Sequence, residues 1–236
     1  MSAVFKREFK AYFTSPIGYV VLAILFYFSG ETFYESNLRG ASPSLLNVYY
    51  MLFTVALLAM LPLLTMRLMS DDKRQKTDQA LLTAPVSLTG VVLGKFLAAL
   101  LLFALGIAIT FVYALIIAFQ VTPDWMVVIG NYLGLVLMGG ALLAIGLLLS
   151  SLTESMFVAG ILTFGVSYIW VTLDSIASSY ADNKLITAVV GFLSISQRYN
   201  HFTLGTVQYN DVVFFLVIQA LFLFLTVRLL DRKRWS

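Results

Sequence analysis

The chain has 236 residues, of which 60% are hydrophobic and 11% are charged, and its mean hydropathy is +0.92. A water-soluble domain of this composition would lack the polar side chains needed to cover its surface, so the composition excludes a soluble protein and indicates a membrane-spanning one. The formal net charge is +3. The uneven placement of Lys and Arg along the chain explains this charge, and we expect no nucleic-acid partner.

Residues 4–14 precede the first apolar run and carry four aromatic side chains on one helical face: Phe5, Phe9, Tyr12 and Phe13. The basic residues of this stretch fall on other faces. The pattern predicts an amphipathic helix that lies in the membrane interface. An ordinary solvated tail is the alternative. Ser15-Pro16 predicts a break after this helix, because the residue before proline disfavours helical backbone.

Six apolar runs of about the length needed to cross a bilayer follow. They cover residues 17–34, 45–66, 91–119, 125–149, 157–173 and 212–230. These runs lack the strict apolar–polar alternation of barrel strands. We therefore predict an all-α, polytopic membrane protein with six transmembrane helices. No clear small-x-small cleavage site follows the first run, so we expect that run to remain in the protein as a span.

Of the 15 Lys and Arg residues, 12 fall on one side of the alternation that the six spans create. These 12 are Lys6, Arg7, Lys10, Arg67, Lys73, Arg74, Lys76, Lys95, Arg228, Arg232, Lys233 and Arg234. Because basic residues concentrate in cytoplasmic loops, this distribution predicts that both termini lie in the cytoplasm.

The longest cytoplasmic connection covers residues 67–90, and residues 77–84 within it have helical character. Thr77 fits a helix N-cap, and Asp78 follows in the first turn, where the helix dipole favours negative charge. Pro85 ends the pattern. A short helix that carries two leucines suits docking into a groove of a soluble partner. A solvated loop that only joins two spans is the alternative.

The stretch Gly90-Val-Val-Leu-Gly94-Lys95-Phe96 superficially resembles a phosphate-binding loop. Such a loop needs four residues between its glycines and Ser or Thr after its lysine, whereas this stretch has three residues and then Phe. We therefore expect no nucleotide cofactor in this chain. We interpret Lys95 as an anchor whose amine reaches the lipid headgroups. Any ATP, with its Mg ion, then binds to another polypeptide.

The middles of the six spans contain no ionisable residue, which disfavours a proton- or sodium-driven carrier. Glu31 and Glu35 lie one helical turn apart at the outer end of the first span. They either line an outer pathway or contact a partner, or they are simply solvated at the interface. The single histidine, His201, has no ligand cluster or catalytic set around it in the sequence, so we expect neither a metal site nor an enzyme.

The glycines of the fourth span concern helix packing. The fourth span carries five glycines, which permit close approach of helix backbones: Gly130, Gly134, Gly139, Gly140 and Gly146. Packing within the subunit explains them, and sliding of helices between two states is the alternative.

Residues 185–195 are apolar but too short to cross the bilayer. We expect an exterior re-entrant or interfacial segment at about residues 185–205.

Five stretches of the sequence, taken in chain order, match the pattern of one protein family. Residues 62–67 read Pro-Leu-Leu-Thr-Met-Arg, residues 77–87 read Thr-Asp-Gln-Ala-Leu-Leu-Thr-Ala-Pro-Val-Ser, residues 93–96 read Leu-Gly-Lys-Phe, residues 146–155 end in Thr-Glu-Ser, and residues 194–205 are followed by Asp211. The chain resembles the membrane subunits of type-2 ABC exporters, in particular the gliding-motility-associated permease branch. The resemblance extends over essentially the whole chain.

The resemblance implies a coupling helix that receives the conformational movement of a separate ATPase subunit. Its residues here would be Thr77, Asp78, Gln79, Leu81 and Leu82. Related chains commonly have a Gly-Thr-x-Glu pattern where this chain has Lys-Thr-Asp-Gln, so the acidic contact shifts to Asp78 or is missing. The resemblance also implies an outer gate in the exterior segment. Its candidate residues are Phe192, Tyr199, His201 and Phe202.

The implied assembly contains two copies of an ABC ATPase subunit and a second permease, identical or related, in the bacterial cytoplasmic (inner or plasma) membrane. An exterior accessory protein is a further possible partner. The chain itself would be a non-catalytic permease subunit of an ATP-driven exporter. An ATPase-independent channel or scaffold is the alternative, and the substrate stays open.

Overall fold

The computed structural model describes residues 2–74, 76, 87–179 and 194–235. Every regular element in these ranges is a helix, and they contain no strand. Six helical segments in the described ranges are long and apolar enough to cross a membrane: Pro16–Arg39, Leu46–Arg74, Leu88–Ala118, Trp125–Leu152, Met156–Leu173 and Tyr209–Arg232. The predicted all-α polytopic fold with six spans is therefore confirmed.

The chain opens with helix α1 (Ser2–Thr14). Three of its four aromatic side chains face the protein: Tyr12 is buried, and Phe5 and Phe9, whose ring centroids lie 5.9 Å apart, pack against the core. Phe13 is exposed. Its lysines are exposed on other faces. Helix α2 (Pro16–Phe33) begins directly after Ser15, with proline in the first turn, where its missing N–H has no cost. The π-helical turn η1 (Tyr34–Arg39) continues α2.

The second span consists of α3 (Leu46–Val55), the π-helical turn η2 (Ala56–Met60) and α4 (Leu61–Thr65). The wide turn η2 lies just before Pro62, which has no N–H to complete the regular hydrogen-bond pattern. A corner over residues 66–69 leads into the short helix α5 (Ser70–Arg74).

The third span is divided at Ala108 into α7 (Leu88–Ile107) and α8 (Ile109–Ala118). Helix α9 (Trp125–Leu152) follows, and the Asp124 side chain caps it by accepting from the backbone N–H groups of its first turn. The remaining helices are α10 (Met156–Ser179), α12 (Ile195–Thr203) and α13 (Tyr209–Trp235).

Helix α9 forms the centre of the bundle and packs against α4, α7, α10, α12 and α13. In its most apolar 18-residue stretch 72% of the residues are buried, against 17% in α10 and 11% in α13. Glycines permit this packing. A Cβ atom on Gly139 would lie 2.1 Å from the ring of Phe103, and one on Gly146 would lie 2.4 Å from the Thr65 side chain. These contacts support the packing interpretation of the glycines.

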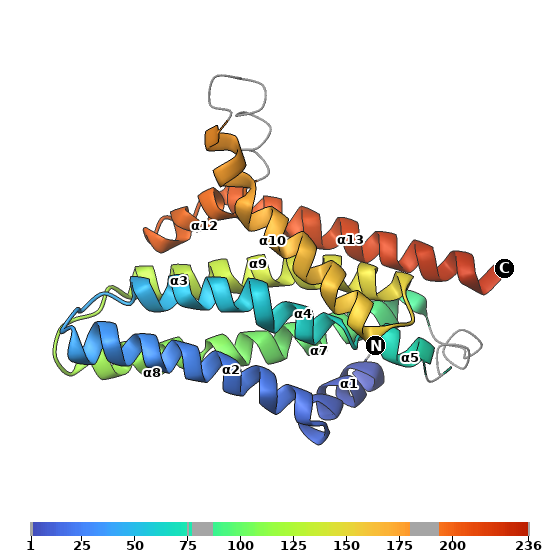
Figure 1. The fold of residues 1–236 in the computed structure, drawn as a ribbon, viewed down its shortest axis with the longest axis horizontal. Coiled ribbons are helices and arrows are strands. Elements are labelled where there is room, and N and C mark those ends of the chain that lie inside the picture. Colours follow the sequence, from blue (N-terminus) through green and yellow to red (C-terminus); the bar gives the residue numbers. More distant parts are fainter. Residues whose placement is uncertain (1, 75, 77–86, 180–193, 236) are drawn as a thin grey trace.

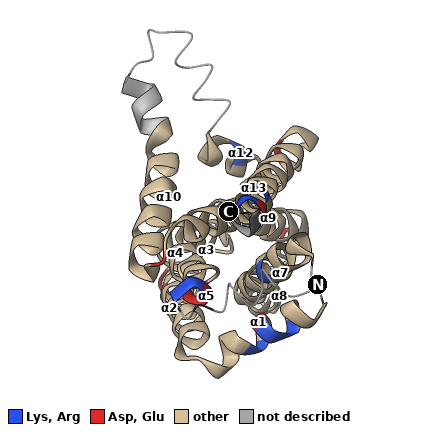
Figure 2. Ribbon diagram, turned by 90° about the vertical axis from the view of Figure 1, so that its right-hand side faces the viewer, with Lys and Arg blue, Asp and Glu red and all other residues tan. Residues whose placement is uncertain are grey.

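Both termini and α5 lie at one end of the bundle, and η1 and α12 lie toward the other end (Figure 1). We call the first of these the terminal end. Figure 2 looks onto it and shows basic residues of α1, α5 and α7 there, together with acidic residues of α5.

Candidate functional site

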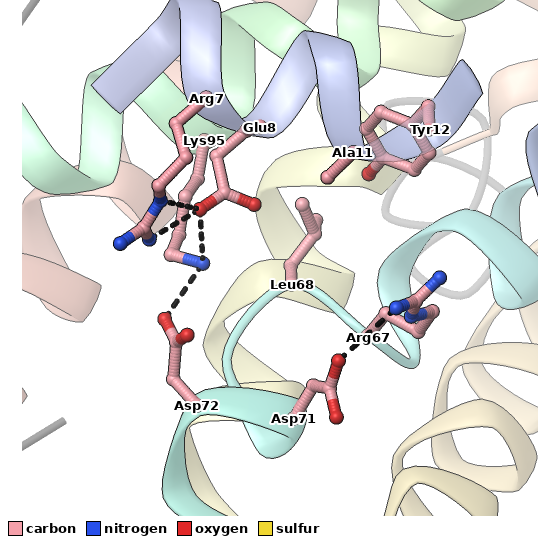
Figure 3. Close-up of a pocket in the computed structure, with 9 residues that line it drawn as sticks. All are labelled: Arg7, Glu8, Ala11, Tyr12, Arg67, Leu68, Asp71, Asp72 and Lys95. Carbon is pink, nitrogen blue, oxygen red and sulfur yellow. Dashed lines mark hydrogen bonds and ion pairs between the residues drawn. The ribbon is translucent and has the colours of Figure 1, made fainter. Parts of the chain in front are cut away.

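A cluster of charged side chains joins three helices at the terminal end (Figure 3). The ammonium of Lys95, on α7, lies 2.7 Å from Oδ2 of Asp72 on α5 and 3.1 Å from Oε1 of Glu8 on α1. Arg7 also donates to the Glu8 carboxylate. We call these four residues the Lys95 cluster. The Lys95 side chain is only 2% exposed, so its charge depends on these carboxylates.

This geometry differs from the sequence interpretation of Lys95 as an anchor at the lipid headgroups. Its side chain points into the protein because α1 and α5 bring two carboxylates to it from distant parts of the sequence. A buried ammonium that has two carboxylate partners at hydrogen-bonding distance gains more from them than from snorkelling to the surface.

A cavity of about 250 Å³ adjoins the Lys95 cluster, between α1, α7 and the corner that precedes α5. Three basic and three acidic side chains contribute to its lining: Arg7, Arg67, Lys95, Glu8, Asp71 and Asp72. Because these charges balance, the lining favours neither a free anion nor a free cation. Tyr12 also lines the cavity, and its burial raises the pKa of its hydroxyl, with the nearby Glu8 carboxylate adding to the rise. This tyrosine stays neutral.

Helix α5 is held on another side by the end of α9. The Ser150 hydroxyl accepts hydrogen bonds from the backbone N–H groups of Met69 and Ser70, each at 3.0 Å, and lies 2.8 Å from the Ser70 hydroxyl. The ammonium of Lys73 donates to the backbone carbonyl of Ser151. A cation at this position also suits the negative end of the α9 dipole. Helix α5 is thus fixed to α7 and α9 together.

Arg67 ties the corner before α5 to the start of the first span. Its guanidinium donates to the Ser15 hydroxyl at 2.8 Å and forms an ion pair with Asp71 at 3.2 Å. Ser70, Ser150, Asp72 and Glu8 were not predicted as site residues. They lie in three different helices, α5, α9 and α1, and no local sequence pattern pairs one of these helices with another.

The candidate coupling residues Thr77, Asp78, Gln79, Leu81 and Leu82 lie outside the described residues. The elements on either side of them are described. Helix α5 ends at Arg74 and α7 begins at Leu88, so in the sequence the segment connects α5 to α7. Both attachment points belong to the helices that the Lys95 cluster joins.

At the opposite end, α12 presents two of the candidate gate residues to the protein interior. The Tyr199 hydroxyl donates to Oδ1 of Asn131 at 3.1 Å, and its ring stacks on Phe53 at 4.8 Å. Phe202 is fully buried, and a Cβ atom on Gly134 would lie 2.8 Å from it. Both side chains dock α12 onto α9. Phe192 lies outside the described residues.

His201, the third candidate gate residue of α12, is part of a polar cluster. Its Nδ1 lies 2.7 Å from Oδ2 of Asp211 at the start of α13, and Arg198 donates to the other carboxylate oxygen at 2.8 Å. The guanidinium of Arg198 also lies 4.0 Å above the ring of Phe214. Since the Asp211 side chain is only 3% exposed, this carboxylate ties α12 to α13.

The two glutamates of the first span do not act together in the structure. Glu31 is exposed, and Glu35 forms an exposed ion pair with Arg39 at 3.2 Å. An exposed pair one turn apart contributes only about 0.3–0.5 kcal/mol. Neither side chain is drawn into a cavity with the other candidate residues.

A larger cavity, of about 950 Å³, opens at the terminal end between the start of α2, the corner before α5 and the start of α10. Its rim carries Arg67, Arg74 and Glu154, and Met156 and Phe157 supply apolar walls. Among the residues that the structure describes, no three metal-ligating side chains lie close enough together to hold a metal ion.

Six apolar helical segments, with α9 as the buried centre among them, define a multi-pass membrane protein, and its charged clusters join helices to one another. A comparison with protein families identifies the family to which the chain belongs. The model of the ABC-2 family transporter protein matches residues 16–230, most of the chain, and the chain therefore belongs to this family of ABC transporter membrane subunits. The match does not distinguish the gliding-motility-associated branch, which stays a prediction. A search of curated proteins gave no match.

Proposed function

We propose that this chain is the permease subunit of an ATP-driven exporter in the bacterial cytoplasmic membrane, with the terminal end in the cytoplasm. It pairs with a second permease, identical or related, and with two copies of a separate ABC ATPase. Residues 77–84 dock on the ATPase and transmit its movement to the spans. Family membership supports the permease role. The distribution of basic residues supports the orientation.

The attachment of α5 is the observation that carries the coupling proposal. A segment that hangs from a loosely held loop would absorb a push from the ATPase. Here the helix directly before the segment is bound to α7 through Lys95 and Asp72 and to α9 through Ser70 and Ser150. A displacement of residues 77–84 therefore moves the central helix and its neighbour together, because interiors packed by such contacts are stiff.

Helices α2 and α10 supply the face that we assign to the second permease and the translocation path. Both expose aromatic side chains, including Tyr19 and Tyr27 on α2 and Phe157 and Tyr168 on α10. The cavity of about 950 Å³ lies between the starts of these two helices. Its charged rim and apolar walls fit an amphipathic cargo that enters from the terminal end. An apolar face of this kind is typical of a site that another chain or lipid covers.

The test is purification of the tagged chain from its native host in mild detergent, with identification of partners by mass spectrometry and an assay of vanadate-sensitive ATP hydrolysis. We expect a stoichiometric P-loop ATPase. The variant Leu81→Asp places a charge on the docking helix and should abolish transport-linked ATP hydrolysis while the chain still inserts into the membrane.

The matched control is Val121→Asp, which places the same charge on an exposed residue between α8 and α9, far from the terminal end. It should leave ATP hydrolysis unchanged. A chain that purifies without an ATPase, or a Leu81→Asp variant with normal coupling, would contradict the proposal and favour an ATPase-independent channel or scaffold.

A further inference from the structure

A groove between α7 and α13 is separate from every site described above. It has a volume of about 590 Å³, within the range of about 300–1,000 Å³ typical of ligand sites. Helix α7 lies on the other side of the bundle from α10 (Figure 2), and the groove shares no lining residue with the cavity between α2 and α10. The proposed translocation path therefore does not use it.

The walls of the groove are apolar over the length of one membrane leaflet. Along α13 the apolar lining residues run from Leu216 to Val227, a rise of about 17 Å. Half of the hydrocarbon core of a bilayer is about 15 Å thick. The side chain of Gln219 lies deep in the groove, but its amide already donates to the backbone carbonyl of Leu137 at 3.0 Å. The groove thus matches one acyl chain in shape and polarity.

The polar groups of the groove gather at its terminal end. Arg228 and Asp231 lie one helical turn apart on α13, and the guanidinium of Arg228 lies 5.2 Å from the ring of Phe224. Among the described residues neither Arg228 nor Asp231 forms an ion pair. The groove therefore presents one cation and one anion side by side, at the level where apolar lining ends.

We propose that this groove binds a phospholipid with an ethanolamine headgroup, with one acyl chain between α7 and α13. The phosphate lies on Arg228 and the primary ammonium on Asp231. A headgroup with one anionic and one cationic group complements this pair of side chains, and the ammonium N–H groups can donate to the carboxylate. A choline headgroup carries no N–H, and a glycerol headgroup carries no positive charge, so both fit Asp231 less well.

The test is native mass spectrometry of the full chain, stripped of lipid in detergent and titrated with phosphatidylethanolamine, phosphatidylcholine or phosphatidylglycerol with identical acyl chains. We expect the first bound ethanolamine lipid to be retained roughly two- to fivefold more strongly than the choline lipid. This ratio of affinities corresponds to the free energy of one exposed ion pair. Asp231→Asn should remove this difference. Arg228→Gln should weaken the binding of all three lipids.

Filling the groove tests its location. Ala220→Trp places a ring between α7 and α13 and should lower retention of the ethanolamine lipid about tenfold, whereas Leu221→Trp, on the neighbouring exposed residue outside the groove, should not. Equal retention of ethanolamine and choline lipids by the unmodified chain, or a preference for the glycerol lipid, would overturn the proposal.

A loss of dimers in Ala220→Trp with unchanged lipid retention would show that a second copy of the chain covers the groove, and would also overturn it. This test does not involve the ATPase. Its failure is therefore distinguishable from failure of the proposed exporter function.

Discussion

Lys95 and Asp72 face one another at 2.7 Å across the terminal end, although the candidate coupling segment lies between them in the sequence. The two helices that carry this segment are therefore joined at its base. The same lysine also binds Glu8 of α1, so α1, α5 and α7 share one buried charge.

Removal of the Lys95 ammonium tests this joint. Lys95→Met should destabilise the protein by about 3 kcal/mol, because Asp72 and Glu8 both lose the buried ammonium. This is the lower end of the range for breaking a buried ion pair, since Glu8 keeps Arg7 and both carboxylates keep some contact with water. Thermal unfolding in detergent measures the change. Lys10→Met, on the exposed face of α1, should have no such effect. Equal unfolding temperatures for Lys95→Met and Lys10→Met would show that the cluster does not hold α1 and α5.

The glycines of α9 provide a second prediction. Gly139→Ala should cost about 1–3 kcal/mol, because its new methyl group overlaps the ring of Phe103 in a closely packed interior. Gly165→Ala in α10 is the matched control, since no atom lies within 4 Å of its new Cβ. Alanine also favours helix over glycine, so this variant should be neutral or more stable by up to about 1 kcal/mol. Equal destabilisation by both substitutions would argue against the close approach of α7 and α9.

Docking of α12 depends on Asp211. Asp211→Asn keeps the size of the side chain but removes the negative charge that contacts both Arg198 and His201. It should lower the stability of the protein by about 3 kcal/mol. Hydrogen exchange of the α12 amides should become faster. Asp124→Asn is the control, because asparagine caps a helix as well as aspartate does. Unchanged exchange of α12 in Asp211→Asn would show that its apolar contacts are enough.

Alkaline pH should destabilise the protein through Tyr12. Its burial raises the pKa of the hydroxyl in the folded state above the value of about 10 in the unfolded chain. Above pH 10 the unfolded chain loses a proton that the folded protein keeps, so stability falls by about 1.4 kcal/mol per pH unit for this group. In Tyr12→Phe the slope of stability against pH should be less steep, whereas Tyr209→Phe, at an exposed tyrosine, should keep it. Identical slopes would contradict the burial of Tyr12.

The sequence was enough to predict the six spans, because each is a long apolar run and the bilayer fixes its length. It was also enough to predict the break at Ser15-Pro16, where proline restricts the backbone. The interpretation of Lys95 was wrong for a physical reason. A lysine at the end of a span snorkels by default, and only the folded structure shows that Glu8 and Asp72 reach it first.

Helix α12 was predicted in part. A short segment before the last span was expected, and Ile195, Tyr199 and Phe202 form an apolar stripe along one face of the helix that was available as a signal of burial. Their partners were not predictable. Asn131 and Gly134 lie in another span, and no local pattern joins them to α12.

The central claim is that residues 77–84 contact the ATPase. The chain contains no cysteine, so single cysteines can be placed and cross-linked without a background from this chain. We would introduce Gln79→Cys, and Val121→Cys as the control, and treat the purified assembly with a short thiol-to-amine cross-linker. The account predicts that Gln79→Cys is joined to the ATPase and Val121→Cys is not. An ATPase that is present but joined only to Val121→Cys, or to neither variant, would contradict it.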